Sequence, residues 1–432
     1  MFCLAHAIDP FRRVLMYLDA PDWLRTSQTS AIFLTAHQQA NLPSLFQTPV
    51  RGASAALLGL IRARDTSPLW CMLMSRPALA HSPLDKVRLI YPLHAASGGD
   101  EASMTVVKLL IGFRASLKEK DVDGETALHR ACANPDIARL LIDSAACINA
   151  RSKYHALPIH FAAQFGQPEI IRMLLDAKAT DLDSGRSFEN NRHDGANPLL
   201  MAVESRNKMS VDLLLAAGAK AVNAKRNSGI SPILLASVHG NVEILKALLK
   251  VNEEDLGLPL NVIGDNWTSP LCGACDSGHL AAVRLLVDSK ATVNAPSPTD
   301  GDCCLTAAVR EGYSEIVSFL LEAKCVTFNA GYTHPIFTPL YFACSEGRSD
   351  IAALLLAACA GTLPRPRGRT PLASAAGHGH VAVVHTMLAF GTLDPGGQAM
   401  AAALDAGHEH ICAMLRAGRR FRRRPLVRRP TW

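Results

Sequence analysis

One pattern recurs along most of this chain and limits its fold more than any other feature. An apolar residue, often preceded by Thr-Pro or Ser-Pro, returns every 28 to 40 residues, and we call these residues the anchors. In most repeats a Gly follows seven residues after the anchor, and an apolar helical segment follows the Gly. Such a period predicts stacked helical repeats rather than separate compact domains. The anchors are Leu93, Leu128, Ile159, Leu199, Ile233, Leu271, Leu305, Leu340, Leu372 and Met400.

Each repeat is interpreted as two antiparallel helices joined by a tight turn. The hydroxyl of Ser231, Ser269, Thr338 or Thr370 can accept from a free backbone N–H at a helix start, and the Pro that follows loses no hydrogen bond at the first helical position. The Gly after the anchor supplies the left-handed conformation that ends the first helix after about two turns. Apolar residues at helical spacing, as in 244–249, then give the second helix one buried face.

This repeat resembles the ankyrin repeat, which has a Thr-Pro-Leu-His core and two short helices. The clearest fragments are 159–166 and 93–96, and the resemblance covers about ten repeats between Tyr91 and Gly418. It implies an all-α solenoid of stacked helix-turn-helix repeats whose concave face binds other proteins. Two long spacings predict lengthened links at 180–192 and 252–265, and the second repeat lacks two residues between its helices.

The residues before the repeats follow another pattern. The sequence of residues 1–50 predicts a helical N-terminal segment. Residues 51–90 contain two apolar stretches, 54–64 and 68–74, whose pattern predicts helices. A solenoid needs an atypical repeat at each end to cover its outermost apolar face. We therefore interpret residues 51–90 as an N-terminal cap or as decayed repeats.

Pro10 to Phe33 resembles the core of an F-box, with an apolar helix, a Leu-Asp-x-x-Asp turn and a Leu-Arg-x-Ser helix, but it lacks the leading Leu-Pro-x-Glu. The resemblance implies a substrate-recruiting adaptor of a cullin-type ubiquitin ligase, in which Leu15, Leu18 and Leu24 dock Skp and cullin subunits. The alternative is a pair of amphipathic helices that caps the solenoid.

Charge is concentrated at the end of the chain. Residues 416–432 contain eight of the 44 basic residues, all Arg, and no acidic residue. The rest of the chain therefore has 36 basic and 38 acidic residues, which nearly cancel. A nearly neutral body argues against a nucleic-acid groove in the fold, so nucleic-acid binding would depend on the Arg-rich tail. We expect residues 419–432 to be disordered, as an import signal or a solubilising end.

The chain is expected to be intracellular, in the cytoplasm, the nucleus or both. Its start lacks the basic and apolar regions of a signal peptide, and no apolar run reaches the roughly 18 residues of a membrane span. The 12 Cys are scattered through apolar helical patterns, where a reduced thiol packs as a small hydrophobe.

Candidate chemical sites are few. Cys272 and Cys275 have C-x-x-C spacing but no second pair at zinc spacing, so we interpret them, with Cys303 and Cys304, as packing residues. The sequence also lacks a nucleophile elbow, a Walker loop and an H-E-x-x-H pair. From the sequence we therefore expect a protein that is not an enzyme and that has no cofactor or metal site.

Four histidines near the end of the chain could meet across adjacent repeats. The four are His378, His380, His408 and His410. Because no carboxylate or Cys lies at matching metal-ligand spacing, we favour the alternative that His380 and His408 are turn residues that hydrogen-bond locally.

Partner-binding residues are predicted at positions without a packing role. These positions lie just before an anchor, or five and six residues after it. Phe165 and Val238 are the most suggestive, because an apolar side chain at such a position can anchor a partner. The predicted set is Glu125, Phe165, Ile230, Val238, His239, Arg310, Glu311, Glu346 and Arg369, and the partner proteins are unknown.

Overall fold

The computed structural model describes residues 50–64, 66–85, 87–98, 103–183, 185, 195–219, 230–255, 269–293, 304–323, 338–358, 370–394 and 396–420. The chain forms two compact units, Met1–Arg226 and Asn227–Trp432. Regular structure in the described ranges is helical, apart from an isolated bridge between Asp85 and Ile90. The predicted all-α fold of stacked helix pairs is confirmed for these residues.

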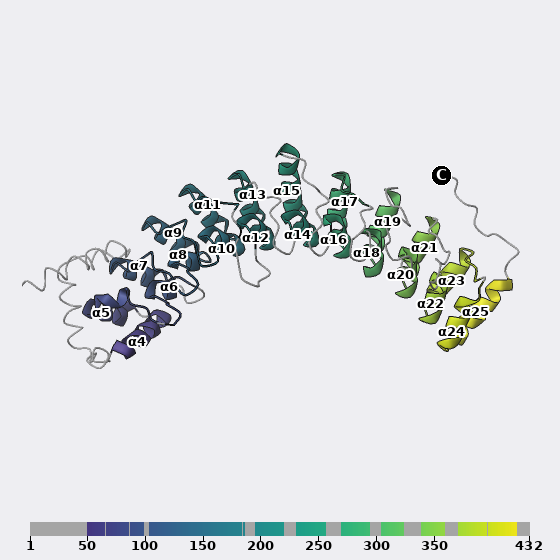
Figure 1. Cartoon of the computed structure of the whole chain (residues 1–432), viewed down its shortest axis with the longest axis horizontal. Helices are drawn as coiled ribbons and strands as arrows, with labels where there is room; N and C mark the ends of the chain where they lie inside the picture. The colour runs from purple at the N-terminus through teal and green to yellow at the C-terminus, as the bar shows by residue number, and fades with distance from the viewer. Residues whose placement is uncertain are drawn as a thin grey trace, which may run out of the picture. The chain divides into compact units, whose positions relative to one another are not determined.

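The first unit is a stack of antiparallel helix pairs. Its first helices pack on one another, α6 on α8 on α10 on α12, and so do its second helices, α7 on α9 on α11 on α13, which form two rows in Figure 1. The helices of this unit are α4 (Val50–Ala63), α5 (Thr66–Ser75), the 3-10 helix η2 (Pro77–Ala80), α6 (Pro92–Ser97), α7 (Met104–Gly112), α8 (Ala127–Ala131), α9 (Pro135–Asp143), α10 (Pro158–Gln164), α11 (Pro168–Asp176), α12 (Pro198–Glu204) and α13 (Lys208–Ala216).

The second unit repeats this arrangement. Its first helices α14 to α24 form one row and its second helices α15 to α25 the other. The helices are α14 (Pro232–Val238), α15 (Val242–Asp255), α16 (Pro270–Asp276), α17 (Leu280–Asp288), α18 (Cys304–Glu311), α19 (Ser314–Glu322), α20 (Pro339–Ser345), α21 (Ser349–Ala357), α22 (Pro371–Gly377), α23 (Val381–Ala389), α24 (Gln398–Asp405) and α25 (Glu409–Arg420).

The link predicted at 252–265 begins later than expected. Helix α15 continues through Asp255, so the first four residues of that predicted link are helical. The sequence 251–255 contains no Pro or Gly to end the helix, which is the physical reason for the difference.

Helices α4 and α5 are stacked like a further repeat, and they confirm the helices predicted at 54–64 and 68–74. Helix α4 packs on α6 and α5 on α7, which is the order seen between neighbouring repeats. Leu57, Ile61 and Leu73 are fully buried in this layer. This packing favours the interpretation of residues 51–90 as a cap or a decayed repeat, which stays a prediction.

The predicted helix starts are present in the structure. Ser231 Oγ accepts from the Leu234 N–H at 3.2 Å, and Thr370 Oγ1 accepts from the Ala373 N–H at 3.0 Å. Ser269 and Thr338 cap α16 and α20 in the same way. Nine of the ten anchors are buried, and Met400 is half-buried. The sequence therefore identified both the phase and the core of the repeats.

The predicted turn glycines all lie in the left-handed region. Their φ angles run from 60° at Gly166 to 87° at Gly312, where a side chain is strained. The repeat anchored at Leu199 has Arg206 at this position, with φ 58°, so the turn is kept there without a glycine. None of the helices in the described ranges is long and apolar enough to cross a membrane.

Several sequence predictions fall outside the described residues. They are the N-terminal segment up to residue 49 with Leu15, Leu18 and Leu24, most of the two predicted links, Cys303, Arg369 and the Arg-rich tail from residue 421. Arg419 and Arg420, which were predicted to begin the disordered tail, are instead the last residues of α25, whose last turn contains no Pro to end the helix.

Candidate partner-binding surface

The carboxyl end of each first helix presents two residues before the turn. We call these residues, five and six positions after the anchor, the turn row. They face outward because the anchor and its small neighbours occupy the buried side of the helix. In the first unit we consider the turn row of the repeats anchored at Ile159 and Leu199, which comprises Gln164, Phe165, Glu204 and Ser205, and in the second unit it comprises Val238, His239, Asp276, Ser277, Arg310, Glu311, Ser345, Glu346, Gly377, His378, Asp405 and Ala406.

Two apolar side chains of the turn row are exposed. Phe165 caps the end of α10 and is 48% exposed, and Val238, the last residue of α14, is 37% exposed. The neighbouring residues Ala162 and Ala236 are fully buried, so both helices have a complete core without Phe165 and Val238. Exposed apolar side chains at such places are available to a partner.

The charged residues of the turn row pair loosely in the second unit. Arg310 Nη2 lies 2.9 Å from Asp276 Oδ1, and Arg310 Nε lies 3.4 Å from Glu311 Oε1. All three side chains are exposed enough that water screens the pairs, which therefore contribute little to stability and can exchange for contacts with a partner. Glu346 is exposed at the end of α20.

Two other predicted residues are more covered. Ile230 and His239 are half-buried, just before and just after helix α14.

A second set of turn residues ties neighbouring repeats together. We call these residues, eight positions after the anchor, the clamp residues: Asn207, His279, Tyr313, Arg348, His380 and His408. His279 Nε2 donates to the Val238 carbonyl at 3.0 Å, and His380 Nε2 donates to the Ser345 carbonyl at 2.8 Å. Each bond reaches the turn row of the preceding repeat. Clamp residues thus have a structural role beside the turn row.

The clamp residues give the turn glycines a second function. A Cβ at Gly240 would lie 2.5 Å from Cγ of His279, and one at Gly278 would lie 2.5 Å from Cζ of Tyr313. The flat side chain of the next repeat therefore packs directly on each of these two glycines. Sequence reasoning missed this role, although a His, Tyr or Arg eight residues after the next anchor is a readable signal.

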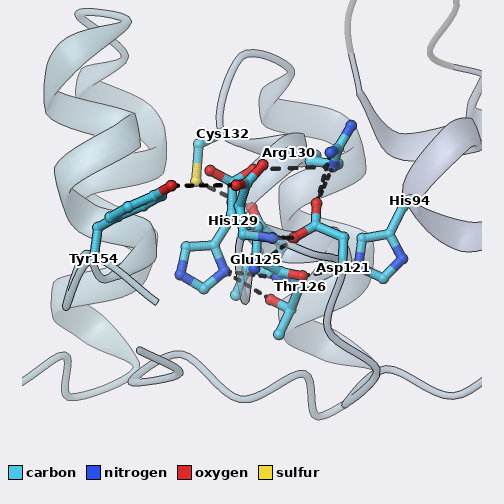
Figure 2. Close-up of polar contacts among 10 residues, drawn as sticks. His94, Asp121, Glu125, Thr126, His129, Arg130, Cys132 and Tyr154 are labelled. Atoms are coloured by element: carbon cyan, nitrogen blue, oxygen red, sulfur yellow. Dashed lines mark hydrogen bonds and ion pairs between the residues drawn. The ribbon is translucent and has the colours of Figure 1, made fainter. Parts of the chain in front are cut away.

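Histidines inside the first unit form another set of contacts (Figure 2). His129 Nδ1 accepts from the Thr126 N–H at 3.0 Å, and its Nε2 donates to the Ala156 carbonyl of the next repeat at 3.2 Å. Burial lowers the pKa of His129 to about 4. His94 Nε2 donates to the Glu125 carbonyl at 2.9 Å, and burial lowers the pKa of His94 as well.

Glu125 belongs to this interior network. Its backbone N–H donates to Asp121 Oδ1 at 2.9 Å, and Asp121 Oδ2 pairs with Arg130 Nη2 at 2.6 Å, as Figure 2 shows. The side chain of Glu125 is half-buried, with Oε2 3.9 Å from Arg130 Nε. Glu125 is thus placed among structural contacts, unlike Phe165 and Val238.

Comparison with known families agrees with this geometry. Residues 93–186, 251–331 and 271–365 match the family described as ankyrin repeats in three copies. This chain is an ankyrin-repeat protein. Ankyrin repeats in general are protein-interaction modules rather than enzymes, and the match supports that class of function.

Several curated proteins share part of this ankyrin-repeat stretch. The chain is 33% identical over 164 residues to ankyrin repeat and KH domain-containing protein mask-1 of Caenorhabditis elegans, covering 37% of this chain and 6% of that protein. It is 34% identical over 169 residues to the B-cell lymphoma 3 protein homolog of Mus musculus, covering 37% and 35%. Tyrosine-protein kinase Shark of Drosophila melanogaster is 30% identical over 177 residues, covering 40% and 18%. The chain therefore spans only a minor part of these relatives.

The histidines at the end of the ankyrin stack differ from expectation in one respect. His380 was predicted to bond locally, but its Nε2 donates across to the Ser345 carbonyl of the preceding repeat, because the turn places its ring over Gly347. His378, for which no such bond was predicted, donates from Nδ1 to the Ser374 carbonyl of its own repeat at 2.8 Å. The two rings stack with centroids 6.0 Å apart. No group of three His, Cys, Asp or Glu in the described parts is arranged to hold a metal ion.

The cysteine pair suggested by C-x-x-C spacing is not the pair that the structure brings together. Cys275 is buried in α16, whereas Cys272 Sγ lies 3.0 Å from Sγ of Cys304 in α18. Both residues of this contact occupy first helices of adjacent repeats. Their approach depends on how the repeats stack, which the spacing within one repeat does not reveal.

Proposed function

We propose that this ankyrin-repeat protein is a non-catalytic scaffold that binds a partner protein through the turn row, on the concave face expected of an ankyrin stack. The observation that carries the proposal is the exposure of Phe165 and Val238 at helix ends whose cores are complete without them. Apolar side chains surrounded by polar groups are typical centres of protein interfaces.

The charges around these residues favour a partner of mixed character. Val238 is followed along the second unit by Asp276, Arg310, Glu311 and Glu346, which carry both signs. Because Arg310 is already partly neutralised by its carboxylate neighbours, the described turn row of the second unit offers no run of cations of the kind that a phosphate backbone requires. A folded or peptide-like protein surface suits the turn row better than a nucleic acid.

Affinity capture followed by mass spectrometry tests this proposal. We compare the wild-type chain with Phe165→Ser and Val238→Ser, and use Phe390→Ser as the matched control. Phe390 is 43% exposed, but it caps the second helix α23, away from the first-helix ends. Loss of an interface anchor worth about 2 kcal/mol reduces affinity about 30-fold.

The expected result is depletion of a partner by Phe165→Ser or Val238→Ser, with recovery unchanged by Phe390→Ser. Circular dichroism and thermal melting check that each variant keeps its helices. Equal recovery by the wild type and both turn-row variants, all folded, would contradict the proposal.

We also propose, from the sequence of Pro10 to Phe33 alone, a ligase-adaptor role in which Leu15 and Leu18 dock a Skp subunit. Leu15→Asp combined with Leu18→Asp should abolish capture of Skp and cullin while the ankyrin repeats stay folded. A loss of thermal stability without any capture of ligase subunits by the wild type would favour the capping alternative.

The location that we propose is intracellular, cytoplasmic or nuclear. It is supported by the buried thiols of Cys132, Cys275, Cys344 and Cys412, which pack as small hydrophobes in the helices. Imaging of the full chain, compared with a chain lacking the Arg-rich tail, tests the nuclear component.

A further inference from the structure

Two cysteines of adjacent repeats meet in the second unit. Cys272 is the third residue of α16 and Cys304 is the first residue of α18, and their Sγ atoms lie 3.0 Å apart. A disulfide bond joins sulfur atoms at about 2.05 Å. The two sulfurs are therefore about 1 Å from bonding distance in the folded protein.

The helices that carry these cysteines are held together independently of the sulfurs. Helix α16 packs on α18, with the anchors Leu271 and Leu305 both buried. Farther along the same two helices, Asp276 and Arg310 form the 2.9 Å ion pair of the turn row. The sulfur contact is thus part of an ordered helix interface.

The two thiols differ in how well a reagent can reach them. Cys272 is half-buried, whereas Cys304 is fully buried. A small oxidant can therefore meet Cys272 first, and Cys304 is placed to attack the oxidised sulfur from the protected side. Other described cysteines lack this arrangement: Cys132 is buried against carbonyl groups, and Cys344 lies 3.4 Å from the Met387 sulfur.

We propose that Cys272 and Cys304 are a reversible redox modification site, in which a low-molecular-weight disulfide converts the two thiols into a disulfide that cross-links adjacent ankyrin repeats. Cys272, after losing its proton, attacks one sulfur of the small disulfide; that disulfide bond breaks, and the departing thiolate takes up a proton. Cys304 then loses its proton and attacks Cys272 Sγ, which releases the second small thiol. Two electrons pass from the protein thiols to the small disulfide.

The cross-link acts on the surface already proposed to bind a partner, although its formation does not depend on that proposal. It would fix the starting ends of α16 and α18, whose other ends carry Asp276 and Arg310 of the turn row. Oxidation would therefore restrict the spacing of these two turn-row residues.

The test uses the full chain under native conditions with excess glutathione disulfide as the oxidant. The protein is then unfolded in denaturant that contains excess alkylating reagent, so that buried reduced thiols react as well, and it is digested and mapped by mass spectrometry without reduction. We expect a peptide pair joined through Cys272 and Cys304, lighter by two hydrogen atoms than the separate peptides, and we expect dithiothreitol to separate it. Both cysteines should be lost from the alkylated pool.

Three variants sharpen the result. Cys275→Ala, a buried cysteine one turn along α16, should form the same cross-link as the wild type. Cys304→Ala should stop at a persistent glutathione adduct on Cys272, because the resolving sulfur is gone. Cys272→Ser should leave Cys304 reduced. Circular dichroism before digestion confirms that each sample is folded.

The proposal is overturned if the folded wild-type chain keeps Cys272 and Cys304 alkylatable in excess glutathione disulfide. A glutathione adduct on wild-type Cys272 that does not resolve, or a link from Cys272 to Cys275 instead, overturns it equally. Because none of these readouts involves a partner, failure here is distinguishable from failure of the turn row to bind.

Discussion

The first unit has histidine immediately after three of its anchors, at His94, His129 and His160, and all three rings are buried. The second unit has Leu234, Cys272, Thr306 and other residues at the same position, and several of its histidines lie at the turns instead. His279 and His380 there reach back to the preceding repeat from the surface. Both arrangements tie adjacent repeats together, but only one places an ionisable ring in the core.

This difference shows which turn residues hold the stack together and which are left to bind a partner. In the second unit the clamp residues are used by the stack, whereas turn-row residues beside them, such as Val238 and Glu346, remain exposed. In the first unit the interior histidines carry much of the inter-repeat bonding, with Asn207 Nδ2 donating to the Gly166 carbonyl at 2.9 Å as a clamp. Surface histidines in the second unit are therefore poor candidates for a chemical site.

Removal of a buried histidine has the largest expected effect. His129→Ala leaves the Thr126 N–H and the Ala156 carbonyl without their partner and opens a cavity. We expect the first unit to lose about 3 to 5 kcal/mol of unfolding free energy. Region-resolved hydrogen exchange measures this loss, and unchanged protection of α8 and α10 would show that the interior bonds are not needed.

The clamp on a turn glycine has the next largest effect. Gly379→Ala places a Cβ 2.9 Å from Cε1 of His408, whereas nothing lies within 4 Å of a Cβ at Gly407, the matched position in the last repeat. Both glycines have positive φ, which alone costs an alanine about 1 kcal/mol. We expect about 2 kcal/mol for Gly379→Ala and about 1 kcal/mol for Gly407→Ala. If both variants lost the same unfolding free energy in thermal or chemical denaturation, the packing of His408 on Gly379 would not contribute to stability.

Acid should weaken the first unit selectively. The folded pKa of His129 is about 4, below the usual 6.5, so the neutral ring is favoured by folding. The contribution of neutral His129 to the free energy of unfolding is fully present above pH 6.5. It is lost as the pH falls toward 4, because the unfolded chain takes up a proton there that the folded chain does not. By pH 5 the loss is about 2 kcal/mol. Hydrogen exchange corrected for pH should show it in α8 to α10, and a His129→Gln chain should lose less.

The smallest effect is expected at a surface clamp. His279→Ala removes one exposed hydrogen bond to the Val238 carbonyl and leaves that carbonyl reachable by water. We expect a loss of about 1 kcal/mol in the second unit. A loss as large as that of His129→Ala, measured in the same denaturant series, would contradict the contrast between interior and surface histidines.

Much of the fold was predictable because each repeat encodes its own local signals. The anchors, the caps at Ser231 and Thr370, and the glycine at 312 depend only on neighbours within one repeat. These signals act over a few residues, so a sequence displays them directly. The retained turn at Arg206 shows that the turn geometry can hold even where the glycine signal is missing.

Contacts between repeats were less accessible to sequence reasoning. The bonds from His380 to Ser345 and from Cys272 to Cys304 join residues more than 30 positions apart. Their partners are chosen by the register of stacking, which no pattern within a single repeat specifies. Glu125 is a different case, because its side chain is partly covered by Arg130 and its backbone is held by Asp121, both in its own repeat, through loop contacts that the spacing from the anchor does not specify.

The most direct test of the account is a hydrogen-exchange footprint of the chain with and without the protein recovered by affinity capture. The account predicts slower exchange with the partner at 164–166, 238–240, 310–312 or 345–347, the turn-row ends of the first helices, and no change in the second helices α17 and α19. Protection confined to the second helices, with the turn-row segments unchanged, would contradict binding through the turn row.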